Sequence, residues 1–72
     1  MDPAHLPLIK QALERQHRKE SFEHALGKAV RLSGLDFGIY IKIISEVREA
    51  AYRDGKDIED AARVLLADKQ GH

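Results

Sequence analysis

The tetrapeptide Ser33-Gly34-Leu35-Asp36 constrains the fold more than any other part of the sequence, because it separates two segments of helical character. Gly34 suits the left-handed backbone conformation that ends many helices, and an apolar residue such as Leu35 commonly packs back against the last turn. Asp36 is a preferred N-cap, since its carboxylate can accept a hydrogen bond from the free N–H groups of the first turn. The tetrapeptide therefore predicts one helix that ends near residue 33 and another that begins at residue 36.

Apolar periodicity and capping residues predict the remaining helices. Pro7 suits the first turn of a helix, and the apolar stripe that follows it loses its phase near residue 16. Ser21 and Asp57 are suitable N-caps, and Gly55 can end the helix that precedes Asp57. One continuous helix from Pro7 to Ser33 is an alternative, because no proline interrupts that segment. We expect four helices, at about 7–16, 21–33, 36–53 and 57–68, with an irregular segment 1–6 and a frayed end 69–72.

Length and composition indicate a single small all-α domain that spans residues 1–72. A domain of 72 residues buries only about 60% of the surface of its unfolded chain, so its stability is marginal. The sequence has no cysteine, which excludes disulfides and thiolate metal sites. It also has no apolar run of the ~20 residues that cross a bilayer, and no leader-like start. We expect a soluble, cytoplasmic helical bundle in which the third helix is central.

The third predicted helix is more apolar than contact with one neighbouring layer requires. Its apolar residues cover more than half of the circumference, whereas an arc of roughly 100° or somewhat more is sufficient. Either the other helices surround this helix, or one apolar edge is exposed and binds another protein or a second copy of the chain. The residues expected in the core are Phe37, Tyr40, Ile41, Ile44, Val47 and Ala51, and those expected at the exposed edge are Ile39, Ile43 and Ala50.

This pattern predicts a small non-enzymatic regulatory or adaptor protein that acts by protein–protein interaction, including formation of a homodimer through the edge of the third helix. If Ile43 lies at that edge, the Ile43→Glu substitution should weaken association and leave a folded monomer. The twelve basic and twelve acidic residues give zero net charge, which argues against a chain that coats nucleic acid or an anionic membrane.

The segment ALGKAVRLSGLDFGIYIKII, residues 25–44, resembles a helix-turn-helix in its spacing of helix, glycine turn and second helix. The resemblance implies a DNA-binding transcriptional regulator that uses residues 21–45 and places the second helix in the major groove. Lys42 and Ser45 would then face the groove, while Lys28 and Arg31 would contact the DNA backbone. Other groove-facing positions hold acidic or apolar residues, which make poor contacts to bases. DNA binding is therefore the alternative to protein binding.

The sequence shows no pattern typical of catalysis or metal binding. No pair among His5, His17 and His24 has the i, i+4 spacing of a zinc-binding helix, and no serine has a histidine at an interpretable spacing. No glycine-rich loop resembles a phosphate-binding loop. We therefore expect no enzymatic activity, no cofactor, no metal, no small-molecule substrate and no membrane contact.

Overall fold

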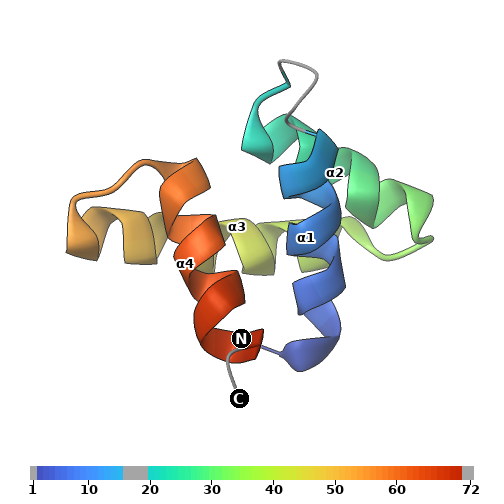
Figure 1. Ribbon diagram of the computed structural model, residues 1–72. Coiled ribbons are helices and arrows are strands. Elements are labelled where there is room, and N and C mark those ends of the chain that lie inside the picture. The colour runs from blue at the N-terminus through green and yellow to red at the C-terminus, as the bar shows by residue number, and fades with distance from the viewer. Residues whose placement is uncertain (1, 16–19, 71–72) are drawn as a thin grey trace.

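A computed structural model describes residues 2–15 and 20–70 of the chain, and all of its regular structure in these ranges is helical (Figure 1). A short 3-10 helix, η1 (Pro3–His5), precedes four α-helices. These are α1 (Leu6–Arg15), α2 (Phe22–Leu32), α3 (Phe37–Asp54) and α4 (Ile58–Gln70). The predicted all-α bundle of four helices is confirmed, and each observed helix lies within two residues of its predicted bounds where the chain is described.

The helices pack so that each has two main neighbours. In Figure 1, α1 and α4 stand side by side in front of α3, which runs across the back. Helix α3 packs against α2 toward one end of the molecule and against α4 toward the other, while α1 packs against α2 and α4. The longest helix therefore has α2 and α4 as its main neighbours, whereas the sequence predicted a central helix surrounded by all three others, and much of its outward side stays uncovered.

The N-terminal segment is more ordered than the prediction of an irregular 1–6 allows. Asp2 Oδ1 accepts a hydrogen bond of 2.9 Å from the Ala4 N–H and caps η1, in which Pro3 occupies the first position. Proline is tolerated there because that N–H has no helical partner. Leu6, which follows directly, is buried. The two prolines therefore lie in the first turns of successive helices, and residue 1 of the segment 1–6 lies outside the described residues.

Helices α1 and α2 are separate, which excludes one continuous helix from Pro7 to Ser33. Ser21 has an extended backbone, with φ −69° and ψ 152°, and its Oγ accepts a hydrogen bond of 3.1 Å from the His24 N–H. The predicted N-cap is therefore confirmed. Residue 16, where the first helix was predicted to end, and the connection 16–19 lie outside the described residues.

Local hydrogen bonds form the predicted turn between α2 and α3. Gly34 has φ +70°, its N–H donates to the Arg31 carbonyl at 3.0 Å, and the Leu35 N–H donates to the Val30 carbonyl at 3.2 Å. These two bonds satisfy carbonyl groups that the end of α2 would leave free. Asp36 Oδ2 then accepts a hydrogen bond of 3.0 Å from the Gly38 N–H, at the start of α3. The turn is thus determined by its own residues.

The start of α4 departs in part from its predicted cap. The Asp57 carbonyl accepts a hydrogen bond of 2.9 Å from the Ala61 N–H, as the carbonyl of an N-cap does. Among the described residues, however, the Asp57 carboxylate does not accept the hydrogen bond from the first turn of α4 that its predicted role as N-cap implies. Gly55, at φ +64°, ends α3 as predicted.

One apolar core joins the four helices, and no polar or charged residue is buried in it within the described ranges. Helices α1, α2 and α3 contribute large side chains, while α4 contributes two buried alanines, which permit a close approach of its backbone. Half-buried side chains of α4 close the edge of the core. The buried residues are Leu6, Leu8, Ile9, Ala12, Leu13, Phe22, Ala25, Leu26, Ala29, Val30, Ile43, Ile44, Val47, Ala50, Ala51, Ala61 and Ala62.

Candidate interaction surface

Exposed apolar side chains gather where α2 ends and α3 begins. The exposed fractions are 70% for Leu32, 43% for Leu35, 64% for Phe37 and 48% for Ile41. Leu32 ends α2, Leu35 belongs to the turn, and Phe37 and Ile41 are neighbours one turn apart on α3. We call these four residues the corner patch. The remaining large exposed apolar side chain in the described ranges, Tyr52, lies near the other end of α3.

A groove of about 340 Å³ adjoins the corner patch and has a mostly apolar lining. Its lining comes from α2, from the turn and from Phe37 at the start of α3, and it includes one cation, Arg31. Arg31 is exposed and makes no ion pair with any residue that the structure describes. The lining residues are Gly27, Val30, Arg31, Leu35 and Phe37.

Packing beneath the patch positions Phe37. Its ring stacks on that of Tyr40, with ring centroids 5.0 Å apart and planes inclined by 24°. The half-buried Tyr40 lies in turn beside Gly27 of α2, where a methyl group added to the glycine would approach Tyr40 Cε1 to 3.8 Å. Farther along, the Arg48 guanidinium donates to the Glu23 carboxylate and ties α3 to α2. This bond raises the pKa of Arg48. The groove therefore lies on two helices, α2 and α3, that contact each other through Tyr40 and Gly27 and through the Arg48–Glu23 ion pair.

The side of the third helix that was predicted to be exposed is buried or half-buried in the structure. Ile43 is 1% exposed, Ala50 is buried, and Ile39 is half-buried against the core. The exposed apolar residues are instead Phe37 and Ile41, which were predicted to be core. The third helix is apolar over a wide arc, but the side that holds Ile43 and Ala50 belongs to the core. Which side of a wide arc is buried depends on where the neighbouring helices lie.

Three of the four residues proposed for DNA contact border different hollows of the surface. Lys28 borders a cleft between α1 and α2, Arg31 borders the apolar groove, and Lys42 borders a depression near η1. Ser45 is exposed on α3. Lys28 is also engaged by a carboxylate within its own chain.

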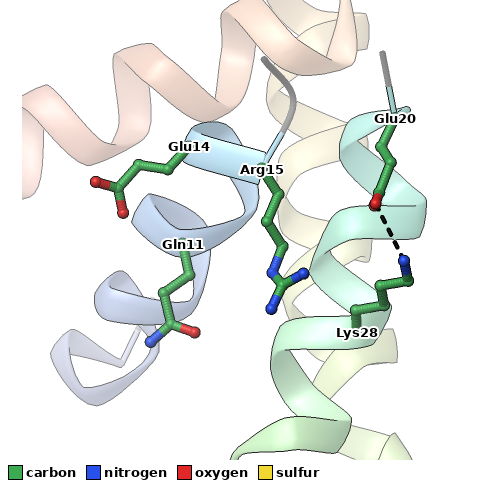
Figure 2. Close-up of a pocket in the computed structure, with 5 residues that line it drawn as sticks. All are labelled: Gln11, Glu14, Arg15, Glu20 and Lys28. Carbon is green, nitrogen blue, oxygen red and sulfur yellow. Dashed lines mark hydrogen bonds and ion pairs between the residues drawn. The ribbon is translucent and has the colours of Figure 1, made fainter. Parts of the chain in front are cut away.

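The cleft between α1 and α2 is polar and has a volume of about 440 Å³ (Figure 2). Glu20 Oε1 accepts a hydrogen bond of 3.1 Å from Lys28 Nζ, which lowers the pKa of Glu20. Glu20 Oε2 is enclosed and has no hydrogen-bond partner in the described part of the chain. Arg15 extends toward the same space in Figure 2. Residues 16–19, which connect α1 to Glu20 in the sequence, lie outside the described residues.

The described ranges 2–15 and 20–70 contain neither a cluster of potential metal ligands nor a helix suited to span a membrane. These residues contain no group of three or more histidine, aspartate or glutamate side chains arranged to hold a metal ion. None of the helices described combines the length and apolar character needed to cross a membrane.

Comparison with known proteins finds no matching family, no matching curated protein and no matching solved structure.

Proposed function

We propose that this protein is a non-enzymatic regulatory or adaptor module that binds protein through the corner patch and its groove. The observation that carries the proposal is the clustering of large exposed apolar residues. Single exposed apolar residues are common on soluble proteins, whereas a cluster beside a groove is typical of an interaction site. Four of these residues lie within the ten-residue segment 32–41, where two helices meet.

The surroundings of the patch also support binding to protein. Interaction sites typically combine an apolar centre containing aromatic residues with a polar rim. Phe37 is an exposed aromatic residue whose ring stacks on the ring of Tyr40. Arg31 lines the same groove, and Asp36 precedes Phe37 in the chain, so both charges lie near the aromatic ring. Side chains fixed before binding lose less conformational entropy when a partner arrives. The patch therefore has the composition of a protein-binding site, and the stacking on Tyr40 restricts the Phe37 ring before a partner binds.

Site-specific photo-crosslinking tests this proposal. A photoreactive phenylalanine analogue replaces Phe37 in one version of the protein and Tyr52 in a matched version, because both aromatic residues are exposed on α3. In cells that express the protein, we expect a discrete crosslinked adduct from position 37 and none from position 52. The purified partner should then bind the wild-type chain and the Tyr52→Glu variant alike, and bind Ile41→Glu at least tenfold more weakly. Absence of any adduct at position 37 would reject the proposal.

Transcriptional regulation through DNA binding is the alternative, and the observed order of α2, glycine turn and α3 supports it. The zero net charge of the chain and the ion pair between Lys28 and Glu20 count against it, since phosphate contacts supply much of the affinity for DNA. Electrophoretic mobility shift with duplex DNA in a series of rising salt concentrations tests this alternative. Binding at low salt that weakens in an Arg31→Gln, Lys42→Gln variant would favour it. No shift at low salt would exclude it.

A further inference from the structure

We infer that the partner of the corner patch is a second copy of the same chain, related to the first by a two-fold axis. This inference rests on the proposed function, because it assigns an occupant to the same surface. A two-fold interface uses one surface twice, so that surface must contain both members of every contact. The corner patch meets this requirement in shape and in charge.

Shape complementarity comes from the protruding ring of Phe37 and the groove beside it. Phe37 is 64% exposed, stacks on Tyr40 and forms one wall of the groove, whose other apolar lining is Gly27, Val30 and Leu35. Its volume of about 340 Å³ is roughly ten times the volume that one water molecule takes in the liquid, which suffices for an aromatic ring. Each copy therefore offers one aromatic side chain and one place to receive it.

Charge complementarity follows from the position of Asp36 next to Phe37 in the chain. If Phe37 enters the groove of the second copy, Asp36 comes to the rim of that groove, where Arg31 of the second copy lies. Asp36 Oδ2 caps α3 through Gly38, but Oδ1 has no partner among the described residues. Arg31 likewise has no ion pair within the described part of the chain. The two-fold axis then forms two equal Arg31–Asp36 pairs, and a strongly acidic or strongly basic partner would satisfy only one of the two charges.

The area required is available on this side of the molecule. A stable dimer typically buries about 800 Å² on each partner, which is about one sixth of the 4789 Å² surface of this chain. The outward side of α3 continues the patch through the exposed residues Ser45 and Arg48. The corner patch can therefore form the apolar centre of such an interface, with the outward side of α3 as its rim.

Molecular mass in solution tests the inference directly. Light scattering and sedimentation equilibrium on the full chain, from about 1 µM to 1 mM, should show a transition from 8.1 kDa to about twice that mass. Phe37→Glu should weaken the dimer at least tenfold and leave a folded monomer, because an acidic residue is favoured in the first turn of a helix. Tyr52→Glu makes the same exchange on the same helix outside the patch and should leave the dimerisation constant unchanged.

A double-mutant cycle tests the charge pairing. Arg31→Gln and Asp36→Asn each remove a charge, and asparagine retains the ability to cap α3. Exposed ion pairs are typically worth about 0.2–1 kcal/mol each, so loss of two pairs should weaken the dimer roughly twofold to thirtyfold. The double variant should be no weaker than the weaker single variant. Strictly additive effects would overturn the assignment of this pair.

The outcomes separate this inference from the proposed function. A monomer at all concentrations, or equal effects of Phe37→Glu and Tyr52→Glu, overturns the second copy as partner. If position 37 then crosslinks to a different protein, the proposed function stands without the homodimer. If position 37 forms no adduct to either kind of partner, both fail.

Discussion

Ile41 and Ile43 lie two positions apart on α3 and occupy opposite environments. Ile43 is enclosed by the core, whereas Ile41 is about half exposed in the corner patch. Truncation of a buried isoleucine removes its transfer free energy and leaves a cavity, which together cost about 2–5 kcal/mol. At roughly 0.05–0.15 kcal/mol per residue, the whole 72-residue domain has a free energy of unfolding of only about 4–11 kcal/mol.

Ile43→Ala should therefore lose about 2–5 kcal/mol of unfolding free energy, and Ile41→Ala less than about 1 kcal/mol. Urea denaturation followed by circular dichroism measures both. The Ile43→Glu substitution should prevent folding, because it buries a charge with no partner, and not yield the folded monomer that the sequence analysis anticipated. Equal losses for the two alanine variants would contradict the assignment of Ile41 to the surface.

Glu20 and Lys28 provide a titration test of the polar cleft. The hydrogen bond from Lys28 Nζ stabilises the ionised carboxylate and lowers the pKa of Glu20. A lowered folded-state pKa contributes stability above the unfolded-state value of about 4.3, and this contribution is lost as pH falls through the folded-state pKa. The carboxyl carbon of Glu20, followed by NMR, should titrate below the ordinary range in the wild-type chain. In Lys28→Met the midpoint should rise, and an unchanged midpoint would show that the pair does not form.

At the scale of the helices, the sequence predicted where most helices begin and end because those signals are local. Ser21, Gly34 and Asp36 act on residues within four positions of themselves, so the hydrogen bonds they form could be inferred from the sequence alone. The exposed face of α3 could not be inferred in this way. Its apolar arc is wider than one contact surface, and the direction from which α4 returns after Gly55 decides which side is covered. The exposed apolar residues of the third helix were therefore assigned to its wrong side.

Two glycines of the α2 region should respond in opposite ways to replacement by alanine. Gly34 has φ +70°, a conformation that costs an L-residue roughly 1–2 kcal/mol, so Gly34→Ala should destabilise by about that amount. Gly27 lies within α2, and an added methyl group would make only ordinary contacts with the Tyr40 ring. Gly27→Ala should raise the unfolding free energy by about 0.5–1 kcal/mol, since alanine favours the helix. Thermal and urea unfolding at micromolar concentration measure both changes, and destabilisation by Gly27→Ala would mean that the groove floor is tighter than observed.

For the molecule as a whole, small size and an uncovered apolar surface are connected. A chain of 72 residues without disulfides has few ways to gain stability other than tight packing or association. Among the residues whose burial is described, the core takes two fully buried alanines from α4 and leaves Phe37 and Ile41 outside. Burial of these side chains against a second copy would add apolar contacts that the monomer cannot make by itself. Stability and self-association should therefore be linked in this protein.

This linkage predicts a melting temperature that depends on protein concentration. A partner that binds only the folded chain raises the apparent stability in proportion to the logarithm of its concentration above the dissociation constant. For a domain of this size, each kcal/mol shifts the melting temperature by about 4–8 °C. Scanning calorimetry from 10 µM to 1 mM should show an increase of several degrees for the wild-type chain and for Tyr52→Glu. Phe37→Glu should melt at one temperature throughout. A wild-type melting temperature that does not change with concentration would mean that the corner patch contributes nothing to stability through self-association.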